Sequence, residues 1–277
     1  MVLEKAYAKL NLSLSVLGKM QNGYHELKTI MVPIKNLYDE LYFEENDTDL
    51  MILEDNTIEN NSILAAAKAF QEKYKTKGAT IKLIKRIPME AGLAGGSADS
   101  SATLRGLNRL FNLNIPLEEL SLLASKLGSD NAFCVFNKAA ICSSRGEDME
   151  FINDEFHFDI LLAKPSFGLK TKDVFDNVKK YSFEESKHNN IIKALKNNDK
   201  ELLDDNIYND LLLPATCVNS ELSGIISNLG STTSRVHMSG SGSTLFVVNF
   251  SENTINELEK DKKIEFIKQV SIVNAIS

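Results

Sequence analysis

A run of small residues in the first half of the chain has the composition of a phosphate-binding loop. Apolar residues at 81–87 predict a strand before it, and a stripe at helical spacing predicts a helix after it. A helix start exposes unpaired N–H groups and partial positive charge, and glycines let an anion approach them. The run has neither a Walker A nor a G-x-G-x-x-G pattern, so no standard phosphate-binding motif decides its role. It therefore indicates either an anion site or a turn that only packs a helix against a sheet. Its residues are Pro88, Met89, Glu90, Ala91, Gly92, Leu93, Ala94, Gly95, Gly96, Ser97, Ala98, Asp99, Ser100 and Ser101.

A second loop of small residues lies near the end of the chain, between predicted strands at 233–238 and 244–250. It reads Ser239, Gly240, Ser241, Gly242, Ser243. Alone, such a sequence favours a hairpin turn. Two small-residue loops in one chain favour anion binding more than either loop does alone.

A lysine and an asparagine lie close together on one face of a strand predicted near the N-terminus. Residues 6–16 alternate between apolar and polar types, which predicts a strand with one buried face. Lys9 and Asn11 then lie next to each other on the other face. From residue type alone, the interpretation of Lys9 as a surface charge is favoured, as it is for Asp130.

The remaining patterns predict helices that alternate with strands, which is typical of a two-lobed α/β or α+β protein. A helix from Pro116 is predicted to end at Gly128, and the polar segment 170–190 is predicted to be irregular and to lie near a lobe boundary. Helices are further predicted near 63–74 (with Asn60 or Asn61 as N-cap), 190–204, 218–229 and 253–262, and strands at 133–141 and 156–163.

Composition narrows the classes of partner. The chain has 277 residues, and its 38 acidic against 31 basic side chains give a net charge of −7, which disfavours nucleic acid as a partner. Its three cysteines, Cys134, Cys142 and Cys217, lack metal-site spacing, and no carboxylate cluster has it either. No apolar stretch is long enough to cross a membrane, and the charged Glu4 and Lys5 argue against a secretory leader. We therefore expect a cytoplasmic protein without a resident metal.

Several motifs, in order along nearly the whole chain, resemble those of the GHMP kinases, a family that includes galactokinase and the homoserine, mevalonate and phosphomevalonate kinases. Residues 88–97 resemble its phosphate-binding motif and residues 239–243 its third motif. Residues 8–12 (Ala-Lys-Leu-Asn-Leu) and 23–27 (Gly-Tyr-His-Glu-Leu) are similar to the branch that phosphorylates a cytidine-diphosphate-linked methylerythritol. Residues 128–130 (Gly-Ser-Asp) and 145–147 (Arg-Gly-Glu) resemble two further motifs of that branch.

The resemblance implies a fold and a reaction. The fold would be an α+β two-lobe GHMP kinase fold, with a lobe like domain 2 of ribosomal protein S5 at residues 1–155 and a ferredoxin-like lobe at 156–277. The reaction would be ATP-dependent phosphorylation of the substrate's 2-hydroxyl, a step of non-mevalonate isoprenoid (terpenoid) synthesis. Lys9 and Asp130 match the catalytic residues: Asp130 would accept or orient the hydroxyl proton, and Lys9 would neutralise charge on the transferring phosphoryl group.

The resemblance also assigns binding residues. The ATP triphosphate would lie on the loop from Pro88 to Ala98, and Asn61 and Lys85 match positions that face the adenine. Asn11 would bond the sugar-alcohol part of the substrate. The cytosine site would consist of Tyr24, His25, Thr171 and Phe175. Without the resemblance, His25 would be interpreted as a packing residue and Lys85 as a solvated lysine at a strand end.

The Mg²⁺ ion is expected to arrive with ATP, held largely by phosphates and water, with Ser97, Asp99 or Ser100 as contacts. The protein is expected to be a monomer or a homodimer. The sequence departs from the family pattern at Gln21 and Asn22, at Asn131 and Ala132, at Ser143 and Ser144, and after Asn209-Asp210-Leu211. Two alternatives therefore stay open: a GHMP kinase with another substrate, or a catalytically weak protein that binds a nucleotide or metabolite.

Overall fold

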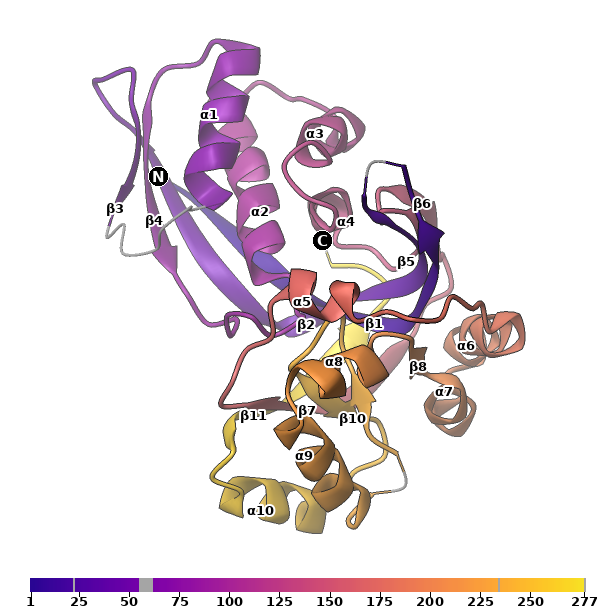
Figure 1. Cartoon of the computed structure of the whole chain (residues 1–277). Helices are drawn as coiled ribbons and strands as arrows, with labels where there is room; N and C mark the ends of the chain where they lie inside the picture. The colour runs from indigo at the N-terminus through magenta and orange to yellow at the C-terminus, as the bar shows by residue number, and fades with distance from the viewer. Residues whose placement is uncertain (22, 55–61, 234, 277) are drawn as a thin grey trace. The chain divides into compact units, whose positions relative to one another are not determined.

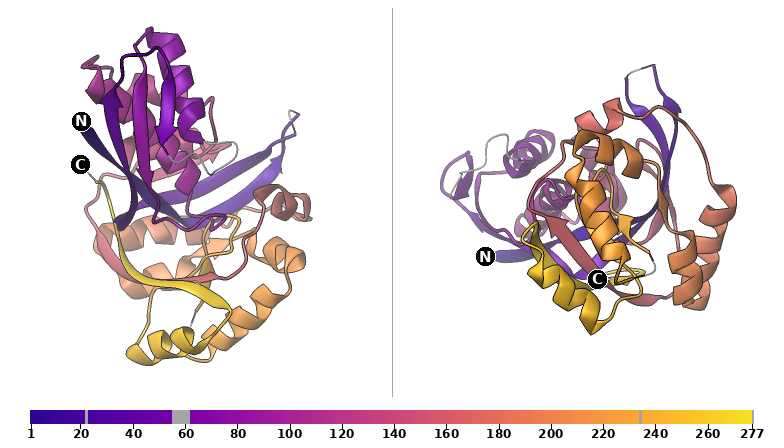
Figure 2. Two further views of the ribbon diagram at one scale, coloured as in Figure 1. Left: turned by 90° about the vertical axis from the view of Figure 1, so that its left-hand side faces the viewer. Right: turned by 60° about the horizontal axis from the view of Figure 1, so that its bottom comes forward.

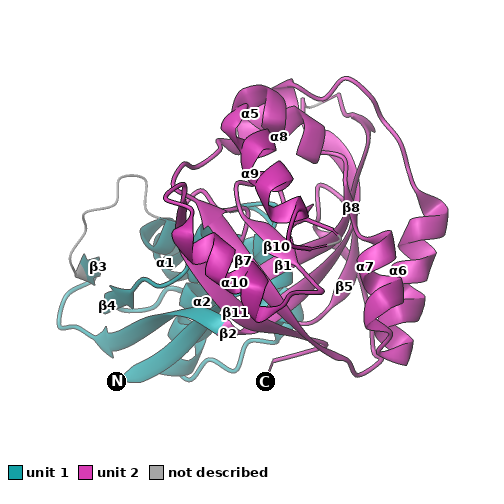
Figure 3. Ribbon diagram, turned by 90° about the horizontal axis from the view of Figure 1, so that it is seen from below, with its two compact units in different colours: residues 1–8, 37–87, 94–137 teal, residues 9–36, 88–93, 138–277 magenta. Residues whose placement is uncertain are grey.

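A computed structural model describes residues 1–21, 23–54, 62–233 and 235–276 (Figure 1). The contacts within the chain divide it into two units (Figure 3). Unit 1 contains residues 1–8, 37–87 and 94–137, and unit 2 contains residues 9–36, 88–93 and 138–277. Two long strands, β1 (Val2–Lys19) and β2 (His25–Glu45), contribute residues to both units. The predicted lobe boundary at residue 155 stays a prediction.

Unit 1 is a small sheet with helices packed against it. The end of β2 pairs antiparallel with β4 (Ala79–Ile84), and β4 pairs parallel with β3 (Met51–Glu54). Leu41, Phe43 and Ile81 are fully buried. At Gly106, an added Cβ would lie 2.3 Å from the Phe43 ring, so only glycine allows this approach of helix to sheet. The helices are α1 (Ser62–Tyr74), α2 (Gly95–Leu110), α3 (Leu117–Ala124) and α4 (Asn131–Phe136).

The segment from 116 to 141 differs from its prediction in two respects. Helix α3 ends at Ala124 rather than Gly128, and the predicted strand at 133–141 is helix α4 followed by the later strand β5. A short apolar run has no periodicity that separates helix from strand. Tertiary contacts favour the helix here: Asn131 Nδ2 donates to Ser100 Oγ (2.9 Å), and Ser101 Oγ donates to the Asn131 backbone carbonyl (2.7 Å), so that both bonds join α4 to α2.

Unit 2 is built on an antiparallel sheet with the strand order β2–β11–β7–β10–β9. The first part of β2 also pairs antiparallel with β5, β5 pairs with β6, and β1 pairs parallel with β8. The strands are β5 (Ala140–Ser144), β6 (Asp148–Phe151), β7 (His157–Pro165), β8 (Tyr208–Asn209), β9 (His237–Met238), β10 (Leu245–Val247) and β11 (Ile264–Val273).

The core of unit 2 lies between this sheet and four of its helices. Leu161 and Leu245 from the sheet belong to one buried apolar cluster with Val174, Ala215 and Ile225 from the helices. Figure 2 shows α9 and α10 (orange to yellow) next to each other. The helices of the unit are α5 (Thr171–Asp176), α6 (Glu185–Asn197), α7 (Lys200–Asn206), α8 (Leu212–Val218), α9 (Glu221–Gly230) and α10 (Glu252–Lys260).

The α+β class is confirmed, as are most of the strongly periodic elements. The predicted helix at 190–204 is two helices separated at Asn198, whose φ of 50° interrupts the helix. The sequence patterns do not predict helices α5 and α8 or strands β2, β3, β6, β8 and β11. The interpretation of β1 as a strand with one buried face is wrong from Lys9 onward, because its polar side chains are buried too.

Candidate active site

A chain of buried polar contacts runs along β1 in unit 2 and includes Lys9 and Asn11. Lys9 is 3% exposed, and its ammonium donates to Asn11 Oδ1 (2.6 Å) and to the Gly92 carbonyl (3.1 Å). Asn11 Nδ2 donates to Thr29 Oγ1 (2.8 Å), and the Thr29 hydroxyl donates to the Ser13 carbonyl. The predicted neighbours Lys9 and Asn11 therefore do lie together. A buried lysine is costly without such partners, which indicates a role other than solubility.

The two loops of small residues meet within unit 2. Ser239 Oγ donates to the Gly92 carbonyl (3.0 Å), and the Thr244 amide donates to the Ala91 carbonyl (3.2 Å). Gly92 has a φ of +70°, and an added Cβ would lie 2.1 Å from the Ser239 carbonyl oxygen. The Gly92 carbonyl thus receives hydrogen bonds from both Lys9 and Ser239. This contact places the loop at 239–243 beside the Lys9 ammonium.

Asn209 holds the second loop in place, and we did not predict a role for it. Its Nδ2 donates to the carbonyls of Met238 and Gly240, at 2.8 Å each, and its Oδ1 accepts from the Leu211 amide. Asn209 also pairs with Leu14 across the β1–β8 ladder. Asn209 therefore connects β1, which carries Lys9, to the loop at 239–243: its backbone pairs with β1, and its carboxamide donates to the loop.

Aromatic side chains from three segments gather around His25 in unit 2. The His25 and Phe175 rings stack with centroids 5.0 Å apart, and the Tyr181 ring lies 6.3 Å from His25. Arg145 lies over the Tyr24 ring at 5.2 Å, and Tyr24 is 52% exposed. Flat, partly exposed rings of this kind can stack on a planar ligand. Burial and the positive charge of Lys19 lower the pKa of His25, which favours the neutral ring.

Helix α5 explains why Thr171 and Phe175 occur four residues apart. This spacing places both side chains on one face of a helix. Phe175 stacks on His25, and Thr171 Oγ1 lies 3.0 Å from Ser241 Oγ in the second small-residue loop. The structure thus connects the aromatic cluster to that loop. Sequence reasoning missed Arg145 and Tyr181 as members of the cluster, although Arg145 follows β5, which pairs with β2 next to Tyr24.

The second half of the phosphate-binding motif opens helix α2 in unit 1. Ala94 precedes the helix with a φ of 57°, and no side chain caps the helix start. The amides at Gly95 and Gly96 begin this uncapped turn. A 16-residue helix with a glycine start and no capping side chain fits an anion such as a phosphate. The motif divides at Leu93 and Ala94: Pro88–Leu93 belong to unit 2, and Ala94–Ala98 belong to unit 1.

Lys85 is held by two carboxylates beside this helix start. Its Nζ lies 2.6 Å from Asp39 Oδ2 and 2.7 Å from Asp99 Oδ2, and 3.1 Å from the position of an added Cβ at Gly95. Asp39 is fully buried, and its other oxygen accepts from the amides of Arg86 and Ile87. The Lys85 ammonium therefore joins Asp39 on β2 to Asp99 on α2 within unit 1.

This cluster changes the acidity of its members. Burial acts to lower the pKa of Lys85, but the carboxylates of Asp99 and Asp39 outweigh it and the pKa lies above its ordinary value. Burial raises the pKa of Asp99 from 3.8 to about 7, although the Lys85 ammonium acts in the opposite direction. Asp99 Oδ1 is buried and has no hydrogen-bond partner within the described residues.

Asp130, the other predicted catalytic residue, lies in unit 1. It lies between the end of α3 at Ala124 and the start of α4 at Asn131, and its carbonyl accepts from the Cys134 amide (3.1 Å). Its side chain is half-buried. Asn61, predicted to face the adenine, lies outside the described residues. A catalytic role for Asp130 stays a prediction.

The predicted Mg²⁺ contacts differ in their availability. Asp99 is engaged by Lys85, and Ser100 Oγ accepts from Asn131, which leaves Ser97 as the partly exposed member of the three. Within the described ranges, no group of three or more His, Cys, Asp or Glu side chains could hold a metal ion. That Mg²⁺ arrives with ATP and is held mainly by phosphate and water stays a prediction.

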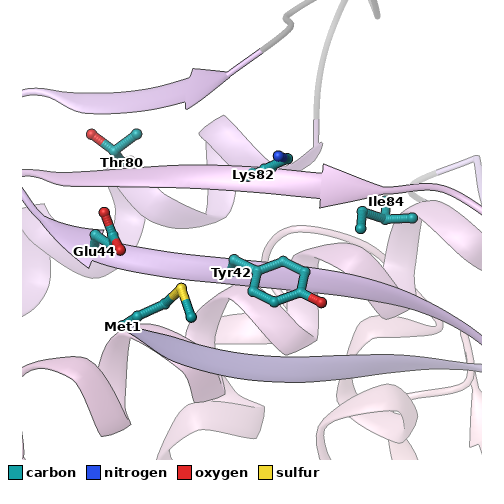
Figure 4. Close-up of a pocket in the computed structure, with 6 residues that line it drawn as sticks. All are labelled: Met1, Tyr42, Glu44, Thr80, Lys82 and Ile84. Carbon is teal, nitrogen blue, oxygen red and sulfur yellow. The ribbon is translucent and has the colours of Figure 1, made fainter.

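A hollow of about 370 Å³ lies elsewhere on unit 1 (Figure 4). It lies on the face of the sheet opposite buried Leu41 and Phe43, and none of the predicted site residues lines it. Its lining residues are Met1, Tyr42, Glu44, Thr80, Lys82 and Ile84.

No helix in the described part of the chain is long and apolar enough to span a membrane.

Comparisons with known proteins agree with this geometry. The family model described as the GHMP kinases N terminal domain matches residues 61–138, and the one described as GHMP kinases C terminal matches residues 191–261. Proteins of Staphylococcus aureus strains MRSA252 and JH9 are each 39% identical, with 89% of both chains covered. Both carry the provisional name 4-diphosphocytidyl-2-C-methyl-D-erythritol kinase.

Solved structures share the fold. The crystal structure of a 4-(cytidine 5'-diphospho)-2C-methyl-D-erythritol kinase superimposes with a TM-score of 0.81 at 26% identity and covers 98% of both chains. A homoserine kinase from Cytophaga hutchinsonii superimposes with a TM-score of 0.74 at 14% identity, covering 99% of this chain and 96% of its own. The second comparison supports the fold alone.

Proposed function

Because the chain belongs to the GHMP kinase family, we propose that it transfers the terminal phosphoryl group of ATP to the 2-hydroxyl of 4-diphosphocytidyl-2-C-methyl-D-erythritol. The bond between the terminal phosphorus and the ADP oxygen breaks, a bond to the hydroxyl oxygen forms, and the hydroxyl proton leaves. The product would serve isoprenoid precursor synthesis. The relatives at 39% identity and the structure at 26% identity support this substrate through their names.

The observation that carries the substrate assignment is the aromatic cluster around His25. Its stacked ring pair and the exposed Tyr24 ring offer flat apolar surfaces and a ring nitrogen to a planar base. Homoserine and mevalonate contain no base, so a site for them would have no use for such a cluster. A cytidine group on the substrate accounts for it.

In this proposal the reaction depends mainly on positioning and on charge, because phosphoryl transfer passes through a loose transition state. The ammonium of Lys9 would neutralise negative charge on the transferring group, and Asn11 would bond the sugar-alcohol part. Asp130 would orient the attacking hydroxyl or accept its proton. The amides that open α2 would hold the ATP phosphates, and Mg²⁺ would supply further charge neutralisation there.

An ADP-release assay with a panel of alcohols tests the substrate. We expect ADP production with the diphosphocytidyl substrate and turnover with mevalonate or homoserine lower by about a hundredfold or more, since the cytosine contacts are then lost. A variant of the cluster, Phe175→Ala, should raise KM for the diphosphocytidyl substrate by about tenfold or more, since a stacked ring contributes about 1 kcal/mol beyond its buried area. Equal rates with a substrate that lacks cytidine would contradict the assignment and favour another GHMP kinase activity.

A further inference from the structure

Thr29 on β2 holds the end of the contact chain that leads to the Lys9 ammonium. We propose that Thr29 is a positioning residue for the phosphoryl transfer: its hydroxyl fixes the orientation of the Asn11 carboxamide and, through it, the position of the Lys9 ammonium. The inference rests on the proposed function for its kinetic consequence, and its geometric part stands on unit 2 alone.

The direction of each hydrogen bond follows from the groups involved. An ammonium can only donate, so the atom of Asn11 that faces Lys9 at 2.6 Å must be the carbonyl oxygen Oδ1. The other end of the amide is then the donor Nδ2, which needs an acceptor and finds Thr29 Oγ1 at 2.8 Å. Thr29 has one hydroxyl hydrogen, and the Ser13 carbonyl accepts it. The Thr29 hydroxyl must therefore accept from Asn11, and it supports the same orientation of the amide that the Lys9 ammonium requires.

Because these side chains are buried, the loss of one hydrogen bond between them is not compensated by water. Thr29 is 2% exposed, Asn11 4% and Lys9 3%, so bulk water does not reach these groups to replace a lost partner. A buried N–H without an acceptor is unfavourable. If Thr29 loses its hydroxyl, Asn11 Nδ2 loses its acceptor, and the opposite amide orientation would set an NH₂ group against the ammonium.

The hydrogen bond from Lys9 to Gly92 indicates the direction in which the ammonium would move if the hydrogen bond to Asn11 were lost. Its remaining hydrogen bond in this chain of contacts is to the Gly92 carbonyl, 3.1 Å away, which already accepts from Ser239. Without the hydrogen bond to Asn11 Oδ1, the ammonium would lose one of the contacts that fix its position and would shift toward the Gly92 carbonyl. A displacement of about 1 Å in a catalytic group is enough to reduce turnover about a hundredfold.

The test compares Thr29→Val with Thr29→Ser and Thr76→Val in the full-length chain. Valine matches threonine in shape and removes only the hydroxyl, whereas serine retains it. Thr76 lies in unit 1, outside the proposed site, and its hydroxyl oxygen is buried with no hydrogen-bond partner within the described residues, so Thr76→Val makes the same chemical change where no side-chain contact depends on it. Each variant is assayed for ADP release with the diphosphocytidyl substrate, and its thermal melting temperature is measured as the control for folding.

We expect Thr29→Val to lower kcat by about tenfold to a hundredfold with KM for ATP changed by less than about twofold. Thr29→Ser should recover most of the kcat, and Thr76→Val should leave both constants unchanged. Unchanged kcat in Thr29→Val would overturn the proposal. So would a loss in Thr29→Ser as large as that in Thr29→Val, because the hydroxyl would then not be the group that matters.

A crystal structure of Thr29→Val separates this inference from the proposed function. We expect the contact between Lys9 Nζ and Asn11 Oδ1 to be lost or the Asn11 amide to be turned. Retention of that contact at its present length would overturn the positioning role, whatever the activity. If the wild-type chain releases no ADP with the diphosphocytidyl substrate, the proposed function fails, and the crystal structure still decides whether Thr29 positions Lys9.

Discussion

At the scale of single residues, the cluster of Lys85, Asp39 and Asp99 in unit 1 concentrates three ionisable groups within 3 Å contacts. One ammonium lies between two buried carboxylates, so the cluster cannot be neutral while both acids are ionised. Burial disfavours the ionised form of Asp99 and raises its pKa to about 7. Protonation of Asp99 near neutral pH would give one negative and one positive charge, which balances the site.

This cluster gives a prediction for the pH dependence of stability. The folded Asp99 binds a proton more tightly than the unfolded chain, so its contribution to the free energy of unfolding is present below pH 4 and is lost as the pH rises to about 7. The loss is on the order of a few kcal/mol. Asp99→Asn should therefore flatten the decline in unfolding free energy between pH 4 and 7, measured by urea denaturation.

The control is Asp47→Asn, which removes a carboxylate from an exposed position of the same unit. We expect it to leave the pH profile unchanged. His188 acts with the opposite sign, because burial lowers its pKa to about 4 and stability is then lost as the pH falls from 6.5 toward 4. An identical profile in wild type and Asp99→Asn would show that Asp99 is already ionised throughout this range.

Several residue contacts were beyond prediction from the sequence. The alternation in 6–16 correctly placed Lys9 and Asn11 together, but nothing in it indicated that Thr29 would complete the contact, because register between strands is set by the whole sheet. Asn209 and Arg145 were noted only as parts of motifs. Their contacts depend on loops brought together by tertiary folding, which local patterns do not encode.

At the scale of elements, the meeting of the two small-residue loops depends on Gly92. Its φ of +70° and the 2.1 Å distance from an added Cβ to the Ser239 carbonyl leave no room for a side chain. The Ser239 to Gly92 hydrogen bond and the Thr244 to Ala91 hydrogen bond both require this approach. Glycine at this position is thus a requirement of packing between loops, and the sequence alone left a simple turn as an alternative.

Gly92→Ala should destabilise the protein by about 1–3 kcal/mol, because the methyl group forces the two loops apart and the backbone conformation is unfavourable for alanine. Gly224→Ala is the matched control. Gly224 lies within α9, where an added Cβ meets nothing within 4 Å, so alanine should stabilise by up to about 1 kcal/mol. Urea denaturation of both variants measures the difference, and equal stabilities would contradict the contact between the loops.

Elements were predictable where the hydrophobic period is long and regular. Strand β1 and helices α1, α2 and α10 follow from alternation or from helical stripes. The predictions for two short segments are wrong. The sequence predicts a strand where α4 lies, and it predicts an irregular segment where α5 lies because the six residues of α5 include few apolar side chains. That second error matters for function, since α5 is what places Thr171 and Phe175 on one face.

At the scale of the whole molecule, family membership accounts for the order of the motifs along the chain, and each unit contains part of the proposed machinery. Unit 2 holds the Lys9 contacts, the paired loops and the aromatic cluster; unit 1 holds Asp130 and the start of α2. The reaction class could be predicted from the sequence because these motifs are spread over nearly 277 residues in order. In the proposed function, the choice of substrate would depend on the few side chains around His25, and activity would depend on Lys9 and Asp130; these roles stay predictions.

The most direct test of the account measures product formation and ligand binding in the same samples. Wild type, Lys9→Met and Asp130→Asn are each incubated with ATP, Mg²⁺ and the diphosphocytidyl substrate; phosphorylated product is quantified by mass spectrometry, and the shift of the melting temperature by ligand is recorded. We expect product from the wild type and a loss of about a thousandfold or more in both variants, with folding and the ligand-induced shift retained. A wild-type chain that is stabilised by the ligands but forms no phosphorylated product would contradict the kinase and show a binding protein instead.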